Sequence, residues 1–167
     1  MDFQVIHCLV LDVDGVLTPG DVTFDDRDGR SMAFSIHDGQ AMKIWQRAGG
    51  QIALITGRTT PIVDRRAEEL GIDAVYQGVS DKARTYEGFL TTRGYETHRV
   101  CCVGDDLPDV ALFSRCGFAV APANAVPTVK RFADFVTRRP GGQGAVAETI
   151  ELILRKQRRW IRHMGVI

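Results

Sequence analysis

The segment LVLDVDGVLT (9–18) decides the fold. Its first residues have the apolar composition of a buried strand, and they lead into two carboxylates, Asp12 and Asp14. Side chains alternate along an extended chain, so both carboxylates are expected on the same side while the chain stays extended. Gly15 then permits a sharp turn that brings the backbone close to a ligand. The segment therefore predicts a strand whose carboxyl end carries chemistry.

Further apolar runs, each bounded by Gly, Asp or Thr, alternate with segments of helical periodicity along the rest of the chain. Strict alternation of this kind predicts an α/β, Rossmann-like fold with a parallel sheet, helices on both faces and right-handed crossovers. The expected strands are 5–12, 51–56, 73–78, 99–105, 117–121 and 134–137, and the expected helices are 38–49, 60–71, 80–94, 106–117, 124–133 and a last one from about 143.

Residues 18–35 break this alternation. The short alternating runs DVTF and SMAF surround the turn sequence DDRDG, which predicts a β-hairpin inserted after the first strand. Only 41 residues separate Asp14 from Thr56 and 25 separate Thr56 from Lys82. Domains seldom fall below about 50 residues, so we expect no cap domain and a single domain over 1–167.

Charge and cysteine content exclude several classes of protein. The chain has 21 Lys and Arg against 21 Asp and Glu, so its formal net charge is zero. A protein that coats nucleic acid is therefore not expected. The first apolar run is interrupted by His7 and Asp12, so it predicts neither a signal peptide nor a membrane helix. The four cysteines lack CxxC spacing, which fits a cytoplasmic protein without a disulfide framework.

The ends of the expected strands carry the polar side chains. Carboxyl ends of parallel strands meet at one rim of a sheet, where active sites of this fold class lie. Four segments would converge there, with Asp12 and Asp14 after the first strand, Thr56 and Gly57 after the second, Lys82 opening the third helix, and Asp105 and Asp106 after the fourth strand.

These residue types together indicate phosphoryl chemistry. Crowded carboxylates need a cation, and the hard oxygens of Asp12, Asp14 and Asp105 suit Mg²⁺. Thr56 and Lys82 offer a hydroxyl donor and a positive charge for a phosphate. A carboxylate beside Mg²⁺ and a phosphate can form an aspartyl-phosphate, and a second carboxylate can act as general acid and base.

Four motifs of this sequence resemble those of a known family. DVDGVLT (12–18), ITGR (55–58), YQGVSDK (76–82) and GDDLPD (104–109) are similar, in order, to the motifs of the haloacid dehalogenase superfamily of phosphatases. The resemblance implies a role for each matching residue: Asp12 as nucleophile, Asp14 as acid and base that also gives Mg²⁺ its backbone carbonyl, Asp105 as second metal ligand, Thr56, Gly57 and Lys82 as phosphate-binding residues, and Asp106 or Asp109 as support of the metal site.

The hairpin, HDG (37–39), FVT (135–137) and GGQGAV (141–146) extend the resemblance to the capless subfamily that includes 3-deoxy-D-manno-octulosonate 8-phosphate phosphatases. It implies a homotetramer joined through the hairpins, a C-terminal tail that reaches a neighbour's site, and Arg58 and Arg66 near the substrate. His37 and Ala147 stand where that subfamily has arginines. The substrate therefore stays open between this eight-carbon sugar acid phosphate, a nine-carbon ulosonate 9-phosphate and sugar phosphates in general.

Two further alternatives stay open. A phosphoacceptor signalling module also combines acidic residues, a Thr and a Lys on a parallel sheet, but its acceptor Asp sits on a later strand than its acidic pair.

The segment RKQRRWIRH (155–163) holds five Lys and Arg residues. It is either a solvated helix face or a source of positive charge for the substrate of a neighbouring subunit.

Overall fold

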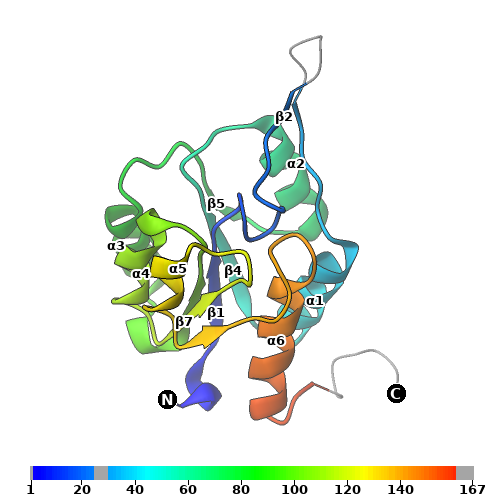
Figure 1. The fold of residues 1–167 in the computed structure, drawn as a ribbon. Coiled ribbons are helices and arrows are strands. Elements are labelled where there is room, and N and C mark those ends of the chain that lie inside the picture. Colours follow the sequence, from blue (N-terminus) through cyan, green and yellow to red (C-terminus); the bar gives the residue numbers. More distant parts are fainter. Residues whose placement is uncertain (1, 25–29, 161–167) are drawn as a thin grey trace.

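A parallel sheet with the LVLDVDGVLT strand at its centre organises the computed structural model, which describes residues 2–24 and 30–160 (Figure 1). The expected turn at 25–29 and the residues after Trp160 lie outside the described part of the chain. The strand order is β5-β4-β1-β6-β7-β8, with every neighbouring pair parallel. The strands are β1 (Cys8–Leu11), β4 (Gln51–Ile55), β5 (Ala74–Tyr76), β6 (Val100–Val103), β7 (Phe118–Ala121) and β8 (Phe135–Val136).

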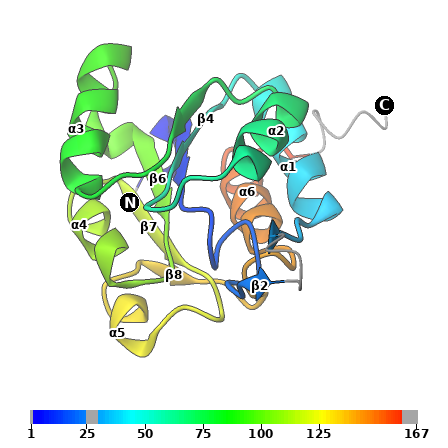
Figure 2. The same cartoon turned by 90° about the horizontal axis from the view of Figure 1, so that it is seen from above.

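Helices cover both faces of the sheet (Figure 2). One layer holds α1 (Ile36–Arg47), α2 (Pro61–Leu70) and α6 (Ala145–Lys156), and the other holds α3 (Lys82–Arg93), α4 (Val110–Phe113) and α5 (Pro127–Lys130). Leu9 and Leu11 of β1 pack in the core under the first layer, whereas Cys8 and Val10 pack in the core under the second. Alternate β1 side chains thus enter two cores, which explains the uninterrupted apolar run.

Two expected helices are shorter than the periodicity predicts, so their extents were wrong. In 106–117 the chain forms a 3₁₀ turn, η3 (Leu107–Asp109), followed by the four-residue α4. The tight turn accommodates Pro108 and the capping contacts of Asp106. In 124–133 the first residues form a turn in which the Ala125 N–H donates to the Pro122 carbonyl, and α5 begins only at Pro127. The Asp106 cap and Pro108 override the helical periodicity in the first segment, and Pro127 does so in the second.

The predicted hairpin is present. β2 (Thr23–Phe24) and β3 (Arg30–Ser31) pair antiparallel and project beyond the main sheet (Figure 1). Within the described ranges, the chain between Asp14 and Thr56 forms only this hairpin, α1 and β4, and the chain between Thr56 and Lys82 forms α2 and β5. The expectation of no cap domain is confirmed. No described helix has the length and apolar character needed to cross a membrane.

A buried carboxylate joins α1 to α6. Asp38 is 1% exposed, and its two oxygens accept hydrogen bonds from the N–H of Gly144 at 3.1 Å and of Ala147 at 2.7 Å. α6 has no capping side chain of its own, so Asp38 caps it from another helix. Burial raises the pKa of Asp38, and the hydrogen bonds to Ala147 and Gly144 oppose that rise. The HDG segment therefore serves the packing of the two helices.

The start of the basic segment also belongs to the fold. The Gln157 side-chain amide donates to the carbonyls of Phe3 and Ile6, both at 2.8 Å, and the Arg159 guanidinium donates to the Ala48 carbonyl at the end of α1. Both contacts lie at the end of the molecule where α6 terminates (Figure 1). Arg155, Lys156 and Arg158 are exposed, as a solvated face predicts, whereas Gln157 and Arg159 are held against the fold.

Candidate functional site

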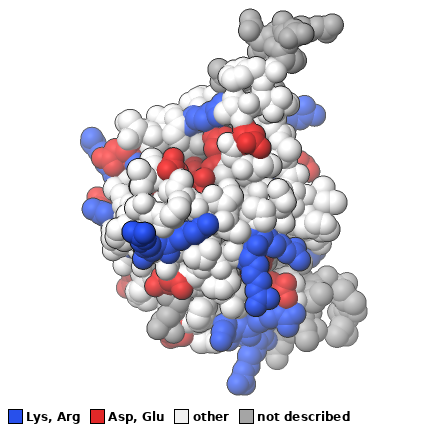
Figure 3. All heavy atoms as spheres, in the orientation of Figure 1, with Lys and Arg blue, Asp and Glu red and all other residues white. Residues whose placement is uncertain are grey.

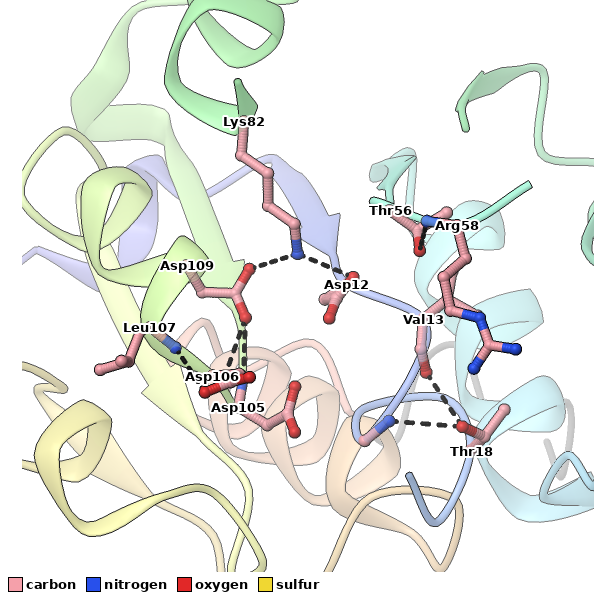
Figure 4. A network of polar contacts seen from close by, with 11 residues as sticks. Asp12, Val13, Thr18, Thr56, Arg58, Lys82, Asp105, Asp106, Leu107 and Asp109 are labelled. Atoms are coloured by element: carbon pink, nitrogen blue, oxygen red, sulfur yellow. Dashed lines mark hydrogen bonds and ion pairs between the residues drawn. The ribbon is translucent and has the colours of Figure 1, made fainter. Parts of the chain in front are cut away.

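The loops after β1, β4 and β6 and the start of α3 meet around a cavity of about 320 Å³ (Figure 4). Most predicted site residues line it, from four separate parts of the sequence. The motif spacing did not single out Gly20, Val79, Ser80 and Pro108, which also line it. The complete lining is Asp12, Asp14, Gly20, Thr56, Gly57, Arg58, Val79, Ser80, Lys82, Asp105, Asp106 and Pro108.

Lys82 links two carboxylates at the floor of the site. Its Nζ lies 2.9 Å from Oδ1 of Asp12 and 2.7 Å from Oδ1 of Asp109. The lysine is the first residue of α3, which Asp81 caps by accepting from the Arg84 N–H at 3.0 Å. Burial alone would lower the pKa of Lys82, but Asp12 and Asp109 outweigh it and the pKa is raised. The ammonium is therefore held charged in the site.

The turn after β6 is folded around Asp109. Its Oδ2 accepts from the N–H of Asp105 at 3.0 Å and of Asp106 at 3.2 Å, while Oδ1 contacts Lys82. A Cβ at Gly104 would come within 2.3 Å of the Asp109 side chain, so the turn requires a glycine there. The sequence predicts for Asp109 only the support of a metal site, and the structure brings it into direct contact with Lys82.

Three carboxylates could hold a cation. Oxygen atoms of Asp12, Asp105 and Asp109 lie within 4.8 Å of one another. Oδ1 of Asp105 is buried and has no hydrogen-bond partner among the described residues. With Lys82 as the adjacent cation, this cluster keeps two negative formal charges, which a divalent cation would neutralise. The residues present therefore fit a hard metal ion, with the Asp109 carboxylate beside the two predicted side-chain ligands.

The acidic cluster is costly without such a cation. Burial, followed by repulsion from Asp109, raises the pKa of Asp12 to about 7, although Lys82 opposes the rise. Burial, followed by repulsion from Asp109 and Asp106, raises the pKa of Asp105 to about 6. Shifts in this direction mean that the folded protein favours the uncharged carboxyl groups. A bound cation would favour the charged forms instead.

Asp14 lies apart from this cluster. Its Oδ1 is 3.7 Å from Nη1 of Arg58, and its side chain is 24% exposed, against 9% for Asp12. Thr56 is buried, and its Oγ1 accepts from the Arg58 N–H at 3.4 Å. Asp12 and Asp14 thus line one cavity, as predicted, but meet different partners. A backbone carbonyl ligand from Asp14 stays a prediction.

Arg66 does not line the cavity. Its guanidinium donates to the Ser35 carbonyl at 3.2 Å and to Oε2 of Glu69 at 2.8 Å, and it lies over the Phe34 ring at 5.4 Å. These contacts tie α2 to the start of α1. The structure therefore does not bring Arg66 together with Arg58, and a contact of Arg66 with substrate stays a prediction.

Gly15 allows the first and fourth motifs to approach one another. It has a φ of 86°, and a Cβ at this position would lie 2.0 Å from Oδ2 of Asp105. The turn is closed by Thr18, whose hydroxyl accepts from the Gly15 N–H at 3.3 Å and donates to the Val13 carbonyl at 3.4 Å (Figure 4). A side chain at position 15 would therefore separate the two acidic loops.

The two departures from the subfamily pattern lie outside the cavity. His37 is exposed on α1. Ala147 lines a separate groove of about 570 Å³ beside α6, together with Arg138 and Arg139. On the face shown in Figure 3, the largest group of basic side chains lies in the lower half and a cluster of acidic side chains lies above the middle, while single residues of each sign also occur in the other half.

Known proteins are similar to this chain over most of its length. The family model of haloacid dehalogenase-like hydrolases matches residues 74–150. The 3-deoxy-D-manno-octulosonate 8-phosphate phosphatase of Yersinia pestis is 38% identical over 152 residues, which are 91% of this chain and 81% of that protein.

Solved structures of such phosphatases have the same fold as this chain. A crystal structure of the Yersinia pestis phosphatase superposes with a TM-score of 0.95 at 35% identity, covering 99% of this chain and 89% of the other. The same phosphatase from Moraxella catarrhalis, in complex with magnesium ion, phosphate ion and the KDO molecule, superposes with a TM-score of 0.93 at 34% identity, covering 96% of this chain and 92% of the other.

The predicted family, fold and enzyme class are therefore confirmed, and the chain is a phosphoric monoester hydrolase. It belongs to the 3-deoxy-D-manno-octulosonate 8-phosphate phosphatase family of the haloacid dehalogenase-like hydrolases.

Proposed function

We propose that this chain hydrolyses 3-deoxy-D-manno-octulosonate 8-phosphate through an aspartyl-phosphate on Asp12, with Mg²⁺ as cofactor. The observation that carries the proposal is the position of Asp12 at the end of β1, with one oxygen 2.9 Å from the Lys82 ammonium and the cavity open to the rest of its carboxylate. Lys82 would hold the phosphate next to the oxygen that attacks it.

In the first step, a carboxylate oxygen of Asp12 forms a bond to phosphorus while the bond from phosphorus to the sugar oxygen breaks. Asp14 donates a proton to the leaving sugar oxygen, for which its position at the more exposed side of the cavity is suited. Lys82 and the Thr56 hydroxyl stabilise the charge on the transferring group. The sugar acid leaves as an alcohol.

In the second step, Asp14 removes a proton from water, whose oxygen forms a bond to phosphorus as the bond to Asp12 breaks. Phosphate leaves, and both carboxyl groups return to their starting state. Asp12 and Asp105, together with the backbone carbonyl of Asp14, would hold the Mg²⁺ ion, which supplies charge neutralisation for the phosphoryl oxygens, and Asp109 would support this site through Lys82 and the turn after β6. Asp106 supports the turn that carries two of these carboxylates.

The substrate class rests on the relatives. The Yersinia pestis and Moraxella catarrhalis proteins carry the name of this phosphatase, and the latter structure contains magnesium, phosphate and KDO. Arg58 at the cavity mouth offers a cation for the carboxylate of the sugar acid. A nine-carbon ulosonate 9-phosphate and a broad set of sugar phosphates stay as alternatives.

A substrate panel tests the proposal. Phosphate release with Mg²⁺ is measured for eight-carbon and nine-carbon ulosonate phosphates and for ordinary hexose phosphates. We expect the highest kcat/KM with the eight-carbon substrate. Equal values across the panel would support a broad sugar phosphatase, and a stable phospho-Asp12 without turnover would support a phosphoacceptor signalling module.

We also propose a cytoplasmic homotetramer in which the C-terminal tail serves a neighbour. α6 carries the chain away from the cavity, and Gln157 and Arg159 fix its end at the opposite side of the molecule (Figure 1). A subunit's tail therefore starts far from its own site, which supports a role at another subunit's site. Nearby chains would also limit access of water to Asp12.

Truncation tests this arrangement. Since Gln157 and Arg159 hold the fold together, the informative cut follows Trp160 rather than Leu154. We expect the shortened chain to keep its melting temperature and its tetrameric mass and to show a higher KM or a lower kcat. Unchanged kinetics in the shortened tetramer would refute the role of the tail, and a monomeric full-length chain would refute the assembly.

A further inference from the structure

A loop that none of the four motifs contains holds two of them together. Asn124, the only asparagine in the chain, follows β7. Its side-chain Nδ2 donates to the Gly15 carbonyl at 3.0 Å, and its Oδ1 accepts from the Gly141 N–H at 2.6 Å. Gly15 directly follows Asp14, so this amide contacts the backbone of the first motif.

The same loop contacts the other acidic segment. Two residues after Asn124, the Val126 N–H donates to the Asp105 carbonyl at 3.0 Å. The loop that starts after β7 therefore has one hydrogen bond to the chain carrying Asp12 and Asp14 and another to the chain carrying Asp105.

The GGQGAV segment completes the arrangement. The Gly142 N–H donates to the Val16 carbonyl at 2.9 Å, and a Cβ at Gly141 would lie 1.8 Å from the Gly15 carbonyl oxygen. Gly141 thus packs directly on the first-motif turn, and the Asn124 amide bridges the two backbones. The Asn124 side chain therefore adds two hydrogen bonds to the backbone bonds that Gly142 and Val126 make between these loops.

We propose that Asn124 is a positioning residue that fixes the separation of the Gly15 turn from the Asp105 loop, beyond the paired ends of β1 and β6, and with it the geometry of the metal site around the attacking carboxylate. This inference rests on the proposed function and deepens it. The separation matters because the free Oδ1 of Asp105 and the carboxylate of Asp12 must share one cation. A displacement of about 1 Å at a reacting group can cost about 100-fold in rate.

Two substitutions separate the two hydrogen bonds. Asn124→Ala removes both. Asn124→Asp keeps an acceptor for the Gly141 N–H but places a carboxylate oxygen against the Gly15 carbonyl, so it breaks the contact to the first motif. Asn124 is exposed, so neither change opens a buried cavity. Both variants should therefore fold.

Gln46→Ala provides a matched control. Gln46 likewise joins separate segments through its side-chain amide, which donates to the carbonyls of Leu70 at 3.1 Å and Gly71 at 3.2 Å. It does not line the cavity. Its loss should cost similar stability and leave kcat and Mg²⁺ affinity at wild-type values.

We expect both Asn124 variants to lower kcat by about 10–100-fold with little change in KM. The dissociation constant for Mg²⁺, measured by calorimetry without substrate, should rise by about tenfold in Asn124→Ala, the lower end of the range typical for residues that orient metal ligands. Selective ¹⁵N-asparagine labelling of the wild type gives one pair of side-chain amide signals, which should shift when Mg²⁺ is added.

Wild-type kcat and Mg²⁺ affinity in both Asn124 variants, or losses no larger than those of Gln46→Ala, would overturn the inference. Amide signals that stay at their urea-unfolded shifts would also overturn it. If the wild type releases no phosphate from any sugar acid phosphate, the proposed function fails, while Mg²⁺ affinity and the amide signals still decide the role of Asn124.

Discussion

Buried Asp38 and half-buried Asp105 have opposite surroundings. Both oxygens of Asp38 accept hydrogen bonds from backbone N–H groups at the start of α6. Asp105 instead lies beside two other carboxylates, and its Oδ1 has no partner among the described residues. Burial raises the pKa of both groups. A raised pKa therefore does not separate a structural carboxylate from one arranged for a ligand, whereas the hydrogen-bond partners do.

The comparison has a physical basis. A buried carboxylate is tolerated when N–H donors replace its hydration, and it then stabilises the packing of two helices. Carboxylates that face one another without enough hydrogen-bond donors repel each other and make the fold less stable. Such a cluster is retained where a bound cation neutralises the negative charges. The contact of Asp38 between α1 and α6 shows the first arrangement, and the carboxylate cluster at the strand ends shows the second.

The largest effect is expected at the nucleophile. Asp12→Asn should lower kcat by roughly 10⁴-fold or more, because the amide oxygen cannot form the acyl-phosphate. The melting temperature without metal should stay the same or rise, because one charge leaves a repulsive cluster. Phosphate release and thermal unfolding measure the two effects. Full activity of this variant would contradict the proposed mechanism.

Asp105→Asn tests the ligand side of the comparison directly. The variant should bind Mg²⁺ at least about 100-fold more weakly, the upper end of the effect of altering residues around a metal. Without metal it should be more stable than the wild type, because the unpaired buried charge is gone. Calorimetric Mg²⁺ titration and thermal unfolding in a chelator check this. Lower stability in the chelator would argue against a strained acidic cluster.

Asp38→Ala tests the structural side. Two buried N–H groups would lose their acceptor, so we expect a loss of about 2 kcal/mol in the free energy of unfolding. Mg²⁺ affinity should stay at the wild-type value. Urea unfolding and calorimetry give the two numbers. A weaker Mg²⁺ site with unchanged stability would reverse the assignment of the two carboxylates.

The smallest effect concerns pH. The pKa of Asp38 is raised above its usual value of 3.8 in the folded state, so the unfolded chain releases this proton first as pH rises. Asp38 therefore lowers the stability of the wild type as pH rises from below 3.8 through its raised folded-state pKa. The free energy of unfolding of the wild type minus that of Asp38→Asn should fall as pH rises through this window, and an increase of that difference in urea unfolding would contradict the assigned sign.

The sequence predicted the sheet, both helical layers and the convergence of the four motifs, because buried parallel strands are uninterrupted apolar runs that end in short loops. Arg66 and Asp109 show what it could not predict. The partners of Arg66 lie at Ser35 and on its own helix, and the bond from Asp109 to Lys82 crosses 27 positions. Only the packed tertiary structure decides such contacts.

Asn124 could have been noticed as the only asparagine in the chain, although composition does not reveal its partners. It lies 109 positions from Gly15, and the helix expected at 124–133 would have pointed its side chain elsewhere. Loop geometry after β7 brings the two residues together. Hydrogen bonds between loops of distant strands are the part of the site least accessible to sequence patterns.

Both outer strands of the main sheet are short. β5 has three residues and β8 has two, so each edge offers few backbone groups to another strand. Long exposed edges template pairing between chains and lead to aggregation. The sheet therefore gives little opportunity for growth by strand addition, and the hairpin formed by β2 and β3 remains as a separate pair of strands through which copies of the chain could associate without extending the catalytic sheet.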